Sequence, residues 1–201
     1  MLLKLFEKEP NMRVVAQVID ILRGGGIIIY PTDTVYAMGC DIFQQHAVER
    51  VCRFKGIDPR KNTLSLICCD LSNISAYARV DTPTFKVLKR NLPGPFTFIL
   101  PGSNALPKLF KGRKTVGIRV PNNNIVRTLV QELGHPLLSA SVRNGDDVTE
   151  YETDPELIHD QYGMSVDAVI DGGYGNHTAS TVVDFTDGTC SVVRQGLGIL
   201  E

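Results

Sequence analysis

Residues 27–39 read IIIYPTDTVYAMG and hold the clearest strand-to-loop transition of the chain. The apolar run Ile27–Tyr30 predicts a short buried strand, which Pro31 ends because proline has no N–H to give to a sheet. Two threonines, an aspartate and a tyrosine then follow on a predicted loop. Since open α/β sheets bind ligands at the carboxyl ends of strands, this loop is a candidate binding segment. The alternative is a turn closed by its own side-chain hydrogen bonds.

Helices and strands are predicted on both sides of this stretch. Apolar residues at helical spacing predict helices over 14–22, ended by Gly24, over 47–52, from near Thr82, and over 125–133, ended by Gly134. Strands are predicted at 64–68, 97–100, 115–120, 137–140, 168–170, 181–185 and 191–194. This interleaving indicates an α/β fold with a mixed sheet. Helical patterns thin out after Gly134, which argues against a regular doubly wound fold.

The length suits one domain or two small ones, and the composition is that of a soluble globular protein; a single domain over residues 1–201 is what the family resemblance given below implies. No apolar run is long enough to span a membrane, and the first residues lack a signal-peptide pattern, so we expect a cytoplasmic protein without a membrane partner. The five cysteines include no CxxC pair and are expected to be reduced and mostly buried. The four histidines show no ligand spacing with them, so no protein-bound metal is expected.

Charge is segregated along the sequence although the net charge is only −1. Residues 53–127 hold 14 Lys and Arg against 3 Asp and Glu, whereas residues 144–201 hold 1 against 12. The basic block suggests a cleft for a polyanion, either nucleotide phosphates or RNA. Alternatively, the two blocks lie side by side in the fold and neutralise each other.

Cations and hydroxyls recur at the ends of the predicted strands. Lys55 lies in a cationic stretch over 53–62, and Arg119 interrupts the apolar strand 115–120, where a charge must be paired or must face a ligand. Serines follow the strand 137–140, Ser180 opens the strand 181–185, and Arg194 closes the last strand. Together they predict one shared pocket. No GxGxxG or GxxxxGK[ST] sequence is present, so neither standard phosphate loop serves it.

Six ordered motifs give the chain a family resemblance: PTDTVYAMG, NLPGPFTFIL, TVGIRVP, DGG, STVVDF and VVRQG. From about residue 27 to 196 the chain resembles the YrdC-like family, which includes the TsaC synthases and the YciO branch, and it is most similar to that branch. The resemblance implies an α/β (α+β) fold with a twisted mixed sheet and helices around a large basic concave cavity. It also implies ATP, L-threonine and bicarbonate as substrates, Mg²⁺ accompanying ATP, and threonylcarbamoyl-AMP and pyrophosphate as products. Partner proteins would then modify tRNA, and binding of double-stranded RNA is a further implied property.

The resemblance also assigns expected roles to residues. Lys55 and Arg119 are the expected catalytic residues. The expected threonine-binding residues are Thr34, Arg119, Ser139 and Ser180, with Arg119 on the carboxylate. The expected nucleotide-binding residues are Lys55, Asn62, Thr115, Ser141 and Arg194.

The chain departs from the family pattern at three places. The KxR element reads Lys55-Gly56-Ile57, the SxN element reads Ser141-Val142-Arg143, and an expected histidine falls at Ile67. Arg60 and Asn144 are the possible substitutes. We therefore expect ATP binding with weak synthase activity. Two alternatives stay open: a non-catalytic protein that binds double-stranded RNA or tRNA, and an enzyme acting on a related carbamate or acyl-adenylate.

Overall fold

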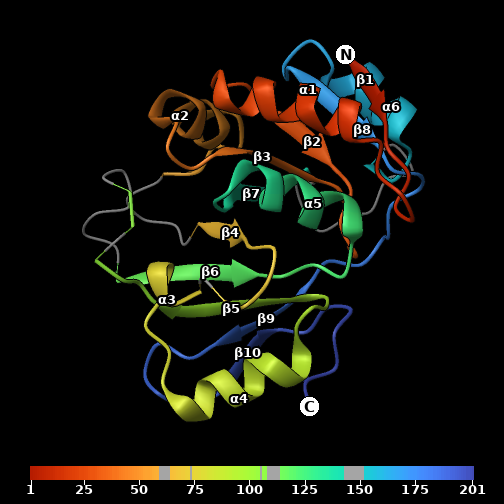
Figure 1. Cartoon of the computed structure of the whole chain (residues 1–201). Helices are drawn as coiled ribbons and strands as arrows, with labels where there is room; N and C mark the ends of the chain where they lie inside the picture. The colour runs from red at the N-terminus through yellow and green to blue at the C-terminus, as the bar shows by residue number, and fades with distance from the viewer. Residues whose placement is uncertain (59–63, 73, 105, 108–113, 143–151) are drawn as a thin grey trace.

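The protein forms a single mixed α/β domain built on one ten-stranded sheet (Figure 1). The structure is a computed structural model that describes residues 1–58, 64–72, 74–104, 106, 107, 114–142 and 152–201. Within these ranges the strands are β1 (Leu2–Lys4), β2 (Ile28–Tyr30), β3 (Ala37–Asp41), β4 (Ser65–Ile67), β5 (Phe96–Pro101), β6 (Thr115–Arg119), β7 (Leu137–Ser141), β8 (Ala168–Asp171), β9 (Thr181–Asp184) and β10 (Ser191–Arg194).

The sheet is mixed, as the sequence predicted. Its order is β1-β8-β2-β3-β7-β4-β6-β5-β9-β10. The pairs β1/β8, β2/β8, β4/β6 and β5/β9 are parallel, and the other neighbours are antiparallel. The strands at the two ends of this order lie at opposite ends of the molecule in Figure 1, with β7 and β4 between them. Segments far apart in sequence therefore meet at the centre of the sheet.

Helices cover both faces of the sheet and give two hydrophobic cores. The helices are α1 (Met12–Arg23), α2 (Gln45–Phe54), α3 (Ile74–Tyr77), α4 (Thr82–Asn91), α5 (Asn124–Leu133) and α6 (Pro155–Tyr162). The buried faces of α1 and α5 pack with alternate residues of β2, β7 and β8. Residues of α2, α3, α4 and α6 pack against the other face, where Leu66, Phe98 and Leu138 lie fully or almost fully buried.

The four predicted helices and all eight predicted strands are confirmed. Asn11 and Asn123 accept hydrogen bonds at the starts of α1 and α5, and Gly134 ends α5 in the left-handed conformation with φ 87°. Strand β3, which follows the predicted loop directly, has no matching prediction. All five residues of β3 are buried, so the side chains on both faces of the strand are covered. The strand therefore lacks the alternation of apolar and polar residues that marks a half-exposed strand.

Helices thin out after Gly134, as expected, since α6 is the one helix among the described residues beyond it, although α6 itself was not predicted. It begins with Pro155 after the capping residue Asp154, whose side chain accepts a hydrogen bond from the Glu156 N–H. The short elements β1 and α3 have no matching prediction either. Among the described residues, no helix is long and apolar enough to cross a membrane.

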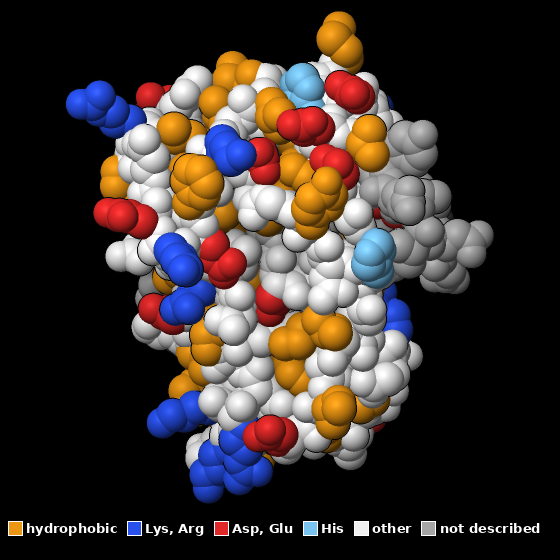
Figure 2. Space-filling view, turned by 90° about the vertical axis from the view of Figure 1, so that its right-hand side faces the viewer, with side chains coloured by type: hydrophobic (Ala, Val, Ile, Leu, Met, Phe, Trp, Pro, Cys, Tyr) orange, Lys and Arg blue, Asp and Glu red, His pale blue; other side chains and the backbone are white. Residues whose placement is uncertain are grey.

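The described cations of the basic sequence block do not all gather in one place. Figure 2 shows most Asp and Glu side chains of one face in its upper half and a group of Lys and Arg at its lower end. Lys86, Lys89 and Arg90 are exposed on α4, whereas Lys55 and Arg119 reach the central pocket described below. Only part of the block therefore serves that pocket.

Candidate ligand-binding site

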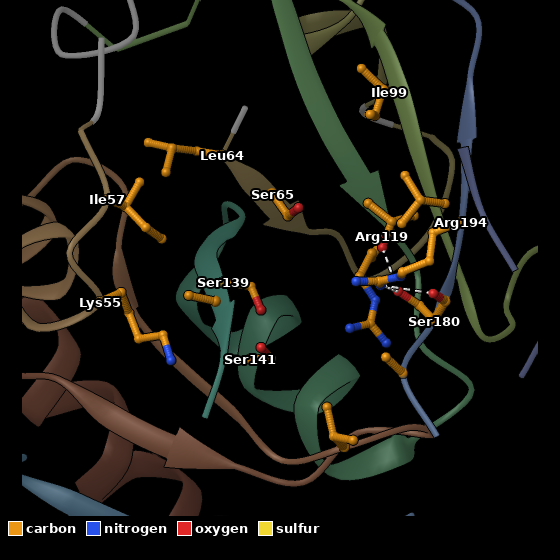
Figure 3. A pocket seen from close by; sticks show the side chains of 15 residues that line it. Lys55, Ile57, Leu64, Ser65, Ile99, Arg119, Ser139, Ser141, Ser180 and Arg194 are labelled. Atoms are coloured by element: carbon orange, nitrogen blue, oxygen red, sulfur yellow. Dashed lines mark hydrogen bonds between the residues drawn. The ribbon is translucent and has the colours of Figure 1, made fainter. Parts of the chain in front are cut away.

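A polar pocket with a volume of about 380 Å³ opens on the central strands of the sheet (Figure 3). Its described walls come from the end of α2 and from β4, β5, β6, β7, β9 and β10. They include three cations, Lys55, Arg119 and Arg194, and five hydroxyl residues, Ser65, Thr97, Ser139, Ser141 and Ser180. No Asp or Glu is among these described lining residues. Such a pocket favours an anionic ligand with several hydrogen-bonding groups.

Strand register places the small residues of the floor side by side. Ser65 of β4 pairs with Ser139 of β7 on one side and with Gly117 of β6 on the other. A Cβ atom at Gly117 would lie 2.7 Å from the Ser65 Oγ, so glycine leaves the space that this hydroxyl occupies. On β7, Leu138 packs into one core while Leu137 packs into the other. Because side chains alternate along a strand, Ser139 and Ser141 share the face of Leu137 and extend it into the pocket.

Arg119 is the most buried cation of the pocket, and its side chain is only 9% exposed. Its Nη2 atom donates to Asp33 Oδ1 at 3.2 Å and to Thr34 Oγ1 at 2.9 Å. Its Nε atom is buried without a partner among the described residues. Burial lowers the pKa of Arg119, and the Asp33 carboxylate opposes that shift. The guanidinium is therefore both paired and left with a donor for a ligand oxygen.

The turn after β2 holds the partners of Arg119. Thr32 Oγ1 donates to the Val35 carbonyl at 2.8 Å and accepts the Thr34 N–H at 3.0 Å. Asp33 Oδ2 accepts the Asn122 N–H at 2.9 Å. The turn interpretation and the binding interpretation of this segment are thus compatible, since its side chains close the turn and also fix Arg119.

Lys55 lies across the pocket from Arg119 (Figure 3). It follows α2, and its Nζ donates to the Val142 carbonyl at 3.1 Å. Burial lowers the pKa of Lys55, while the negative charge of Glu152 raises it. The cations of the pocket are therefore divided between two sides rather than gathered in one cluster.

Arg194 and Ser180 form the wall beside Arg119. Arg194 Nη2 donates to the Ser180 carbonyl at 2.8 Å and lies 3.4 Å from its hydroxyl. The Ser180 Oγ is also 2.8 Å from Thr97 Oγ1. The hydroxyl network links β5, β9 and β10, so Arg194 is oriented although its strand is exposed at the edge of the sheet.

The structure brings most of the sequence-predicted site residues together. The pocket lining contains Lys55, Arg119, Ser139, Ser141, Ser180 and Arg194. Thr34 is fully buried and does not line the described pocket, but its hydroxyl accepts a hydrogen bond from Arg119, which does. Thr115 begins β6 and is not among the described lining residues. The predicted contact Asn62 and the possible substitutes Arg60 and Asn144 lie outside the described residues.

Several pocket features were not predicted from the sequence. Asp33, Ser65 and Thr97 belong to the site, and Ile57, Leu64 and Ile99 add an apolar wall. Ile57 lies in this wall, where the family's KxR element has an arginine. Ile67, at the position where the family pattern has a histidine, is fully buried in the core with α5 and is not among the described lining residues of the pocket.

The described residues do not supply a protein-held site for Mg²⁺. They contain no group of three or more His, Cys, Asp or Glu residues that could hold a metal ion. Mg²⁺ prefers carboxylate and phosphate oxygens, and the described pocket lining lacks carboxylates. The five cysteines are free, with Cys40, Cys52 and Cys68 buried, Cys69 partly buried and Cys190 exposed.

Fold and pocket define a single-domain α/β protein with a cationic, hydroxyl-lined pocket. Residues 20–196 match the family of Sua5, YciO and YrdC domains, described as telomere recombination. The chain belongs to this family, as its motifs predicted. The uncharacterized protein YciO of Escherichia coli K12 is 44% identical over 192 residues, covering 94% of this chain and 92% of YciO.

The family includes enzymes. The threonylcarbamoyl-AMP synthase of Vibrio vulnificus is 33% identical over 185 residues, covering 90% of this chain and 97% of the synthase. The crystal structure of E. coli YciO matches with a TM-score of 0.91 and 40% identity over 99% of this chain and 97% of that one. Sua5 of P. abyssi, solved with L-threonine, shares the fold, with a TM-score of 0.86 and 24% identity over 98% of this chain and 57% of Sua5.

Proposed function

We propose that this protein binds ATP and L-threonine in the central pocket and forms threonylcarbamoyl-AMP slowly from them and bicarbonate. One observation carries the proposal. A buried arginine with a donor that has no partner among the described residues lies across the pocket from a lysine, and the described lining of that pocket holds no Asp or Glu. The family relation to threonylcarbamoyl-AMP synthases supports the choice of substrates.

Each of the two cationic sides of the pocket, at Arg119 and at Lys55, has a proposed ligand group. A carboxylate at Arg119 would satisfy the unpartnered Nε donor, because planar carboxylates match the guanidinium fork. Phosphate groups would lie toward Lys55 and Arg194, whose positive charges attract them. The hydroxyls of Ser139 and Ser141 lie between Lys55 and Arg119 in Figure 3 and can donate to either ligand.

The proposed reaction requires positioning more than acid–base catalysis. The threonine amine and bicarbonate condense to a carbamate with loss of water. A carbamate oxygen then bonds to the α-phosphorus of ATP while the bond to the bridging oxygen breaks and pyrophosphate leaves. The protein would contribute orientation through Arg119 and charge stabilisation through Lys55 and Arg194. Mg²⁺ would enter with ATP as part of the substrate, since the described residues offer no carboxylate cluster for it.

Slow turnover is proposed because the wall at Ile57 is apolar. A second cation at this place would help to fix the triphosphate, and the isoleucine cannot replace it. Binding tolerates loose geometry, whereas a misplacement of about 1 Å can reduce a rate roughly a hundredfold.

Two measurements test the proposal together. The protein is titrated with ATP by calorimetry, with and without L-threonine and bicarbonate, and pyrophosphate release is followed in the same mixtures. We expect ATP and threonine to bind, and pyrophosphate to appear slowly and only when all three substrates are present. Absence of threonine binding would overturn the proposed function. Binding of double-stranded RNA without binding of either small substrate would favour the non-catalytic alternative.

A further inference from the structure

Asp33 is the carboxylate that faces the deepest cation of the pocket. Its Oδ1 accepts from Arg119 Nη2 at 3.2 Å, and its Oδ2 accepts the Asn122 N–H at 2.9 Å. The two side chains are 10% and 9% exposed, respectively. Because both carboxylate oxygens have a donor and Asn122 follows β6, Asp33 is held at a fixed place behind the guanidinium.

The two arginines of the pocket consequently differ in effective charge. Arg119 is neutralised by Asp33, whereas the hydrogen bonds of Arg194 within the described part of the chain go to the uncharged carbonyl and hydroxyl of Ser180. The positive charge of Arg194 also disfavours the charged form of Arg119, so the two cations lie within electrostatic reach of each other. An incoming anion therefore meets, on the same wall, one arginine with a carboxylate partner and one that has no such partner among the described residues.

Charge and geometry at Arg119 select between two kinds of anion. A dianionic phosphate would be repelled by the Asp33 charge about twice as strongly as a carboxylate, since the Coulomb energy scales with ligand charge. A carboxylate carries one charge and still gains a charge-assisted hydrogen bond from the unpartnered Nε donor. We propose that Asp33 is a specificity residue that excludes phosphate from Arg119 and so reserves this arginine for the carboxylate of the amino-acid substrate.

This inference rests on the proposed function, which supplies a phosphate ligand and a carboxylate ligand for the same pocket. Without Asp33, the two ligands would compete for Arg119. The residue would act through Arg119 without touching the reacting atoms, so its test needs a readout that loss of structure alone would not change.

The experiment measures L-threonine affinity by calorimetry with and without saturating inorganic phosphate. In the wild type we expect phosphate to change threonine affinity little. In Asp33→Asn, which removes the charge and keeps the size, we expect phosphate to weaken threonine binding by about tenfold or more. Asp33→Glu keeps the charge, so it should resist phosphate even if its altered reach weakens threonine binding itself.

Asp81→Asn is the matched control, because it removes a carboxylate charge at an exposed helix cap, where asparagine caps equally well. It should behave as the wild type. Equal resistance to phosphate in Asp33→Asn and the wild type, with both folded by circular dichroism, would overturn the role of Asp33.

A separate outcome identifies failure of the proposed function. If the wild type binds no threonine, that function fails, and direct phosphate titration still tests Asp33. Tighter phosphate binding in Asp33→Asn than in the wild type would then support the exclusion of phosphate, and unchanged phosphate binding would contradict it.

Discussion

Arg119 combines three properties in one side chain: burial, a carboxylate partner and an unpartnered donor. The sequence predicted that this charge must be either paired or ligand-facing, and the structure shows that Arg119 is paired with Asp33 and also lines the pocket. Asp33 was not predicted as the partner because it lies 86 positions away in the chain. Nothing local in the sequence specifies which distant loop approaches the end of β6.

Substitution of Arg119 should affect the two substrates unequally. Arg119→Ala should weaken L-threonine binding by about 2–4 kcal/mol, because a charge-assisted clamp is lost and a carboxylate is left without its partner. ATP binding should change much less, and Arg119→Lys should restore little because an ammonium lacks the planar fork. Calorimetry with each ligand separately measures both effects. Equal losses for ATP and threonine would contradict the carboxylate role.

Ile57 offers a gain-of-function test at the apolar wall. Ile57→Arg should raise the rate of pyrophosphate release, since its side chain already lines the pocket and the new cation could contact phosphate there. Ile57→Met is the size control and should not raise the rate. A steady-state pyrophosphate assay compares the three proteins. If the wild type releases pyrophosphate as fast as a family member whose KxR element is complete, the proposal that Ile57 slows turnover is wrong.

Helix boundaries were predictable where local chemistry determines them. The ends of α1 and α5 follow from their capping asparagines and from glycine, and their buried faces follow from apolar spacing. Strand β3 was not predictable in the same way, because a strand buried on both faces lacks alternation. Likewise, the sequence predicted which strand ends carry hydroxyls, but only the sheet register places Ser65 between Ser139 and Gly117.

The end of α5 provides a test at the scale of one element. Gly134 has φ 87°, and a Cβ there would meet open space, so conformational strain is the expected cost of substitution. Gly134→Ala should lower the free energy of unfolding by about 1 kcal/mol. Gly134→Asn should cost less because asparagine tolerates this conformation. Urea unfolding measures both values, and a larger loss for Asn than for Ala would contradict the explanation.

At the scale of the whole molecule, one sheet carries the entire pocket. Its described lining residues run from Val35 to Arg194, so ligand binding depends on nearly the full fold. A ligand that binds only the folded state stabilises it by mass action.

Ligand stabilisation should therefore be visible in thermal unfolding. At about one hundred times its dissociation constant, ATP should add roughly 2.7 kcal/mol to the free energy of unfolding and raise the midpoint by about 5–10 °C. At the same ATP concentration the rise should be clearly smaller in Lys55→Ala, which removes a pocket cation, and unchanged in the exposed-site variant Asp81→Asn. Scanning fluorimetry gives the midpoints. An equal rise in all three proteins would place the nucleotide elsewhere.

The parallel pairing of β5 with β9 affects how the chain emerges from the ribosome. Phe96 and Phe98 pair with Thr181 and Val183, which are synthesised more than eighty residues later. Strand β6 can pair with one edge of β5 early, but until those later residues leave the exit tunnel the other edge of β5 stays unpaired, and such an edge promotes aggregation or recruits chaperones. Ser180 and Arg194 of the pocket are synthesised equally late. Ligand binding therefore cannot stabilise the nascent chain while that edge of β5 is exposed.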